Sequence, residues 1–267
     1  MKLAFSTLGC PEWTFAQILD NAARMGYSAL EIRGIEGQMA AADIEYFKPG
    51  RQQTTKRMLK DRGLTMCGFG SSLSYDAPEK AGEMFDEGKR TVDVCAAMDI
   101  PRIRVFGNTI PEGRSISAAA DMAAEGITRL CEYAEGTPVE ILLEVHGNFN
   151  TVEIMQAVLS RISHPKFGIL WDVAHSDRIY GDGWQPFYET VLPKLRHIHI
   201  KDHRRVNGET QLCRVGEGDI PLKDIVRRVC AEGYNGYFSL EWEKKWHPEL
   251  PSCDTEFPAF PGFMEQI

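Results

Sequence analysis

Eight short apolar segments, each ending in polar or charged residues, are the feature of this sequence that most restricts its fold. A stretch long enough to form a helix lies between successive segments, and the unit recurs roughly every 25–40 residues. Alternation of buried strands with helices is typical of an α/β protein with a parallel sheet. The eight segments are Leu3–Thr7, Ala29–Arg33, Leu64–Phe69, Arg102–Phe106, Val139–Glu144, Phe167–Asp172, Arg196–Ile200 and Tyr237–Glu241.

The stretch after the first segment has the clearest helical pattern. Thr14 can cap its N-terminus, and Gly26 can end it, because glycine adopts the left-handed conformation that follows many helices. Between these two positions, apolar residues recur at the spacing of one helix face. They are Phe15, Ile18, Leu19, Ala22 and Met25. The same order of helix, glycine turn and strand returns at residues 231–241.

The length of 267 residues leaves two arrangements open, two domains or one large barrel. No Ser/Gly-rich or charged linker divides the chain, and the glycine-rich phosphate fingerprint of a doubly wound sheet is missing after the first segment. We therefore expect a single domain over residues 1–267, a (β/α)8 barrel with eight parallel strands. Residues from about 244 to 267 are rich in proline and aromatic residues and predict an extended tail that packs on the barrel or joins subunits.

Charge and composition restrict the partners. The 38 acidic and 30 basic residues give a net charge of −8, which argues against nucleic acid or an anionic membrane. No apolar run is long enough for a membrane helix, and Leu3–Phe5 is too short for the core of a signal peptide. The seven scattered cysteines include no C-x-x-C pair, so we expect free thiols and a cytoplasmic protein.

Four side chains of metal-ligand type stand at the ends of the last four segments: Glu144, Asp172, His199 and Glu241. In a barrel all four would meet at the C-terminal mouth, where such enzymes place their chemistry. Three carboxylates that close repel one another unless a cation neutralises them. Oxygen ligands with one imidazole suit manganese, magnesium, cobalt or a catalytic zinc. The competing interpretation is four unrelated polar residues that cap loops or form salt bridges.

Five motifs surround the polar residues at the ends of the later segments. They are Leu-Glu-Val-His-Gly-Asn (143–148), Trp-Asp-Val-Ala-His (171–175), His-Ile-His-Ile-Lys-Asp (197–202), Val-Gly-Glu-Gly-Asp-Ile (215–220) and Ser-Leu-Glu-Trp-Glu (239–243). Taken in order and position together, they resemble those of the xylose-isomerase-like barrels, and the resemblance covers nearly the whole chain. This sugar phosphate isomerase/epimerase group includes ketose 3-epimerases, inosose dehydratases and, more distantly, endonuclease IV.

The resemblance implies that the four strand-end residues hold one divalent metal, usually manganese. It also implies that Glu144 and Glu241 exchange protons with a sugar or sugar phosphate through a metal-stabilised enediolate. His175 and Arg205 match substrate-binding residues of the epimerase branch.

Other polar residues have two interpretations each. His146 shares a face with Glu144 and either contacts substrate or forms a hydrogen bond within its loop. Lys201 is expected at the lip of the mouth, with substrate within reach. Glu31 points inward and binds substrate hydroxyls or pairs with a basic group such as Arg33, whereas His197 fits a core histidine. A phosphorylated substrate would need basic groups at the mouth, and the candidates are Arg33, Arg104, Lys201, Arg204 and Arg205.

Three alternatives to an isomerase or epimerase remain. A lyase or dehydratase acting on a keto-sugar or keto-inositol needs the same metal and base. A phosphodiesterase of the endonuclease IV kind needs histidines on early strands, and no histidine precedes His146. A non-catalytic barrel, or one completed by a partner subunit, is the third. We expect a small sugar or polyol as the partner, no nucleic acid and no membrane, with a homo-oligomer left open.

Overall fold

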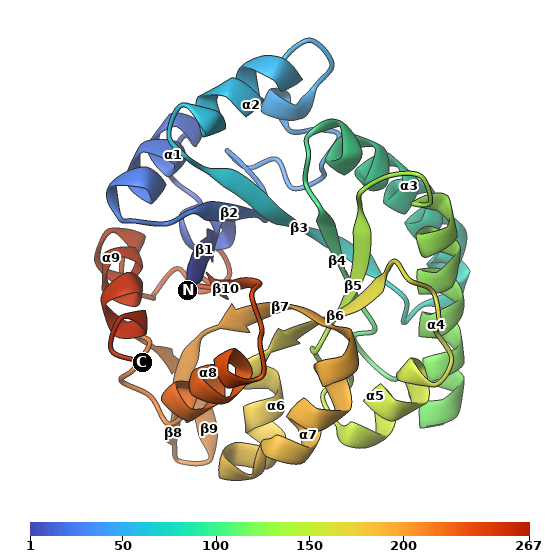
Figure 1. The fold of residues 1–267 in the computed structure, drawn as a ribbon. Helices are drawn as coiled ribbons and strands as arrows, with labels where there is room; N and C mark the ends of the chain where they lie inside the picture. The colour runs from blue at the N-terminus through green and yellow to red at the C-terminus, as the bar shows by residue number, and fades with distance from the viewer.

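The computed structural model describes all residues from Met1 to Ile267, and it is a closed barrel of eight parallel strands surrounded by helices (Figure 1). Around the barrel the strands follow the order β1, β2, β3, β4, β5, β6, β7 and β10, and β10 pairs with β1 to close it. The barrel strands are β1 (Lys2–Ser6), β2 (Ala29–Ile32), β3 (Thr65–Ser74), β4 (Arg102–Phe106), β5 (Glu140–Glu144), β6 (Phe167–Asp172), β7 (Leu195–Ile200) and β10 (Tyr237–Leu240).

All eight predicted strand segments are confirmed, and the predicted α/β barrel with them. The largest difference is in β3, which runs on to Ser74 rather than ending at Phe69. Its pairing with β4 shifts register after Gly70, so the extra residues form an irregular extension toward the mouth.

Nine helices lie around the strands and connect them in sequence (Figure 1). They are α1 (Phe15–Arg24), α2 (Gln52–Lys60), α3 (Ala81–Ala97), α4 (Ile116–Tyr133), α5 (Val152–Leu159), α6 (Val173–Tyr180), α7 (Gln185–Val191), α8 (Leu222–Ala231) and α9 (Cys253–Met264). The expected N-terminal cap of α1 is present, since Thr14 Oγ1 accepts a hydrogen bond from the Gln17 backbone amide and Gln17 Oε1 accepts one from the Thr14 backbone amide. None of these helices has the length and apolar character needed to span a membrane.

Half of the tail predicted to be extended, residues from about 244 to 267, forms α9, so the predicted extended conformation is wrong there. The tail does pack on the barrel, as one of the two predicted alternatives had it. Ser252 caps this helix, and Phe257, Phe260 and Met264 recur at helical spacing on its buried face. Burial of these side chains outweighs the helix-breaking tendency of Pro258 and Pro261, which the prediction followed. As the helix after the last barrel strand, α9 completes the outer ring next to α1 (Figure 1).

A second unpredicted element is the antiparallel hairpin of β8 (Asp202–Val206) and β9 (Glu209–Cys213), which lies outside the barrel between β7 and α8. Asn207 and Gly208 form its turn, both with positive φ. An Asn-Gly pair is a strong hairpin signal, because this turn needs two residues that tolerate the left-handed conformation.

Candidate active site

Glu144, Asp172, His199 and Glu241 meet at the carboxyl ends of their strands. Each residue offers one ligand atom, and these four atoms all lie within 4.8 Å of one another. Glu144 and Asp172 are the last residues of β5 and β6, His199 is the penultimate residue of β7, and Glu241 directly follows β10. All four side chains are buried.

Parallel pairing explains why these side chains meet. His199 stands in register with Asp172 on one neighbouring strand and with Ser239 on the other. Side chains alternate along a strand, so the apolar Ile198 and Ile200 point to the helices while His199 points into the barrel. The predicted grouping of ligand-type residues is therefore a real geometric cluster.

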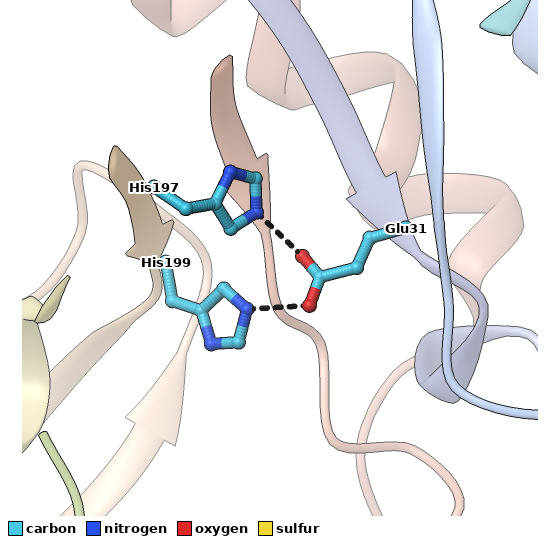
Figure 2. Close-up of side chains that lie close together, drawn as sticks. All are labelled: Glu31, His197 and His199. Atoms are coloured by element: carbon cyan, nitrogen blue, oxygen red, sulfur yellow. Dashed lines mark hydrogen bonds and ion pairs between the residues drawn. The ribbon is translucent and has the colours of Figure 1, made fainter. Parts of the chain in front are cut away.

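Glu31 lies beside His199 of this cluster and bridges the two histidines of β7, His197 and His199 (Figure 2). Its Oε1 is 2.8 Å from His199 Nε2, and its Oε2 is 2.9 Å from His197 Nε2. Both oxygens are engaged and only 2% of the residue is exposed, which favours the alternative prediction for Glu31, a pairing with basic groups. The partners are histidines rather than Arg33.

Two buried atoms of the cluster form no hydrogen bond of good geometry. Such atoms show whether the cluster could hold a metal, because a bound cation would satisfy them. His199 Nδ1 lies 3.3 Å from an oxygen of Glu144 and of Glu241 without a hydrogen bond of good geometry. Asp172 Oδ2 also has no hydrogen bond of good geometry, although the Lys201 ammonium lies 2.8 Å away, while Asp172 Oδ1 accepts one from the Ala174 backbone amide. Buried polar atoms are rarely left unsatisfied. One free imidazole nitrogen among carboxylate oxygens is a donor set that fits a divalent cation.

Lys201 neutralises part of this acidic cluster. Its Nζ lies 2.8 Å from Asp172 Oδ2 and 2.5 Å from Glu241 Oε2, and it also pairs with Glu243. Burial lowers the pKa of this ammonium group, but Asp172 and Glu241 raise it more, to well above its ordinary value. Lys201 is therefore a buried cation inside the mouth rather than a group at its lip.

The carboxylates of the cluster differ in their surroundings. Burial raises the pKa of Glu144, but the ion pair with the Arg104 guanidinium and the contact with His199 together outweigh this effect and lower this pKa to about 2. Burial likewise opposes ionisation of Glu241, and His199 and Lys201 hold its pKa well below the usual range. Both glutamates are thus ionised at neutral pH, as a proton acceptor must be.

The mouth contains a pocket of about 380 Å³ next to the cluster. Glu144 and Glu241 line its floor, together with Lys201 and His146, both predicted to contact substrate. Of the basic residues proposed for a phosphate, Arg33 and Arg104 also line this pocket. The remaining lining residues are Leu8, Phe106, Glu243 and Trp246.

His146 lines the pocket wall on the β5 side, and His175 packs against it. The two rings are tilted by 51° with centroids 4.3 Å apart, and His175 Nε2 lies 3.8 Å from Asp172 Oδ2. Burial and the nearby Lys201 lower the pKa of His175 to about 2, so its imidazole is neutral. His146 Nδ1 is 3.1 Å from Asn108 Oδ1.

Arg205 lies outside the pocket, on the hairpin strand β8. Its guanidinium pairs with Asp177 of α6, and the side chain is 41% exposed. His203 on the same strand is fully buried, with its Nε2 2.9 Å from Asp177 Oδ2. The Asn-Gly turn was the signal that would have placed both residues on a hairpin.

Three comparisons place this geometry among known proteins. The model of the xylose isomerase-like TIM barrel family matches residues 19–255. Fructoselysine 3-epimerase of Escherichia coli O157:H7 is 24% identical, with 90% of each chain covered. Inosose dehydratase of Lactiplantibacillus plantarum is 23% identical, covering 84% of this chain and 82% of the relative.

Solved structures with the same fold include the IOLI protein with a binding zinc atom, at a TM-score of 0.82 and 17% identity over 99% of this chain and 97% of that one. D-Psicose 3-epimerase from Clostridium cellulolyticum H10 has a TM-score of 0.72 and 18% identity over 90% and 84% of the two chains. At these identities the likeness establishes the fold.

Proposed function

Because the chain belongs to the xylose isomerase-like TIM barrel family, we propose that it is a divalent-metal-dependent isomerase or epimerase of a sugar or sugar phosphate. The observation that carries this proposal is the buried cluster of Glu144, Asp172, His199 and Glu241, in which His199 Nδ1 has no hydrogen-bond partner. The epimerase relative supports the reaction type, and the zinc in a protein of the same fold supports a metal.

Glu144, Asp172, His199 and Glu241 would hold the metal, which is manganese in our proposal, with magnesium, cobalt and zinc as alternatives. When bound, a divalent cation supplies Lewis acidity that stabilises negative charge on neighbouring substrate oxygens. Glu31 Oε1 lies 2.8 Å from His199 Nε2 and would accept its proton in a hydrogen bond, which would leave Nδ1 as the atom that faces the metal.

Glu144 and Glu241 are the proposed acid/base pair. They reach the cluster from β5 and β10, on opposite sides of His199 in the barrel order. One ionised glutamate takes a proton from the carbon beside the carbonyl. The other glutamate first takes up a proton from solvent and then delivers it to the enediolate. Delivery from the opposite face inverts the carbon, which is the requirement for epimerisation. His175, neutral and buried beside Asp172, can donate a hydrogen bond to a substrate hydroxyl, and His146 lines the pocket wall beside it.

A second candidate function is that of a lyase acting on a keto-sugar or keto-inositol. It is supported by the inosose dehydratase among the relatives. The same base starts both reactions, and the difference is whether a leaving group departs from the next carbon. Incubation of the manganese-loaded protein with a panel of keto-sugars, followed by mass spectrometry, separates the two. We expect a product of unchanged mass; loss of one water would establish the dehydratase.

We propose a small sugar or polyol as the partner, which the polar pocket at the mouth and the epimerase relative support. We further propose a cytoplasmic location, supported by seven cysteines that are all unpaired. A partner-dependent barrel is disfavoured because the proposed ligands all come from this one chain. Turnover by the purified chain alone tests this point.

A further inference from the structure

Arg33 lies on the wall of the pocket, directly after β2, and is held in place by its neighbours. Its backbone amide donates to Thr7 Oγ1 at 2.8 Å, and its Nη2 donates to Ser72 Oγ at 2.9 Å. The guanidinium carbon lies 5.9 Å from the centre of the Trp246 ring, which is half exposed at the rim. The side chain is therefore positioned before any ligand arrives.

One edge of this guanidinium is free. Arg33 Nη1 is buried and has no hydrogen-bond partner, although only 9% of the residue is exposed. The other two cations of the pocket are paired: Arg104 with Glu144, and Lys201 with three carboxylates. Arg33 has no carboxylate within the 4.0 Å of an ion pair. A buried cation without a counter-ion costs free energy, so an unpaired arginine in a pocket marks a place for an anion.

The local packing keeps two guanidinium groups close together. A Cβ atom at Gly70 would lie 2.8 Å from Arg33 Cδ and 3.1 Å from Arg104 Nη2, so glycine leaves them the room they need. Burial and the charge of Arg104 together lower the pKa of Arg33 to about 10. The group stays protonated at neutral pH, and a bound anion would remove the repulsion.

We propose that Arg33 binds an oxyanionic group on the substrate, a carboxylate or a phosphate at the end of the molecule remote from the reacting carbon. This inference rests on the proposed function and narrows its substrate to acidic ketoses. A planar guanidinium binds such groups through two parallel hydrogen bonds, and Arg33 offers its free Nη1 at the pocket wall. Trp246 would cover the apolar side of the substrate chain.

The test uses three ligands that differ only at their terminal carbon: D-fructose, D-fructuronate and the terminal phosphate ester of D-fructose. Calorimetry measures the affinity of each for the full-length, manganese-loaded protein. Arg33→Met removes the charge and keeps most of the side-chain length. Arg24→Met, on the exposed face of α1, is the matched control.

We expect at least one acidic ligand to bind the wild-type protein about tenfold or more tighter than D-fructose. Arg33→Met should abolish that preference and leave D-fructose affinity within about twofold, while Arg24→Met keeps the preference. Whichever acidic ligand binds more tightly identifies the group that Arg33 prefers, a carboxylate or a phosphate. Equal binding of all three ligands, or an undiminished preference in Arg33→Met, overturns the subsite alone. Absence of any sugar binding, with manganese bound, overturns the proposed function as well.

Discussion

Glu241 has two roles in the proposed site, because its carboxylate is both a metal ligand and a proton acceptor. It lies 3.3 Å from His199 Nδ1 and 2.5 Å from Lys201 Nζ. Glu241→Gln keeps the shape and removes the charge, so we expect turnover to fall by about 10³-fold or more with the fold unchanged. Steady-state rates and circular dichroism measure the two effects. Glu249→Gln, exposed in the same segment, is the control, and wild-type activity in Glu241→Gln would refute the acid/base assignment.

Glu31 orients His199 through a hydrogen bond to the imidazole Nε2 (Figure 2). Substitution by Gln leaves at most one acceptor for the two imidazole N–H groups, so His199 loses part of its support. We expect manganese affinity to fall by about 10–100-fold, because ligand-orienting partners typically contribute that much. Calorimetry measures the affinity without any substrate. The control is Glu140→Gln, at the first residue of β5 and therefore at the opposite end of that strand from Glu144; this variant should bind manganese as the wild type does. Unchanged affinity in Glu31→Gln would show that Glu31 does not orient the ligand.

The sequence predicted which residues reach the mouth but not how they pair there. Strand-end position and alternation were enough to group Glu144, Asp172, His199 and Glu241. The placement of Glu31 required the barrel to be closed, because its partners lie 166 and 168 residues away on β7. The burial of Lys201 also depends on three carboxylates from β6 and the segment after β10, and no local pattern encodes that arrangement.

At the element scale, the loop between the hairpin and α8 is held by one carboxylate. Asp202, almost fully buried, accepts hydrogen bonds from the amides of Gly216, Gly218, Ile220 and His203. A Cβ atom at Gly218 would lie 2.1 Å from Asp202 Oδ1, so the loop needs glycine there. The motif at 215–220 is thus a structural clamp beside the mouth.

Replacement of Asp202 by Ala should destabilise the protein by about 3 kcal/mol, because buried amides lose a charged acceptor. Urea unfolding followed by circular dichroism measures the free energy of unfolding. Asp224→Ala, exposed in the first turn of α8, should change it by less than about 0.5 kcal/mol. Equal stability of the Asp202 variant and wild type would show that the clamp is dispensable.

Elements with a periodic pattern were predictable, and those that depend on tertiary contacts were not. The eight barrel strands follow from apolar runs that are buried on both faces. Helix α9 contains two prolines, and its stability comes from packing on the barrel rather than from local propensity.

For the molecule as a whole, α9 joins the end of the chain to its beginning. Phe257 is fully buried with its ring 4.3 Å from Phe5 and 5.7 Å from Trp13, and its carbonyl accepts a hydrogen bond from the Tyr27 hydroxyl at 2.7 Å. We propose that residues 1–267 form one cooperative domain, in which loss of these contacts weakens the entire barrel.

Substitution of Phe257 by Ala should lower the free energy of unfolding by about 3–5 kcal/mol. Pro258→Ala, exposed on the same helix, should not destabilise, because alanine favours a helix. Fluorescence and circular dichroism should report one coincident transition in both variants. Two separate transitions, with the barrel unaffected in Phe257→Ala, would show that α9 is an independent appendage.

The most direct test of the metal-dependent function is a manganese titration of chelator-treated protein, followed by calorimetry. The account predicts one ion per chain for the wild type, and affinity at least about tenfold weaker for Asp172→Asn, because the neutral amide is a poorer ligand than a carboxylate. Arg24→Met should titrate as the wild type does. If wild-type protein binds none of manganese, magnesium, cobalt and zinc, or if Asp172→Asn binds manganese as tightly as wild type, the proposed metal site is wrong.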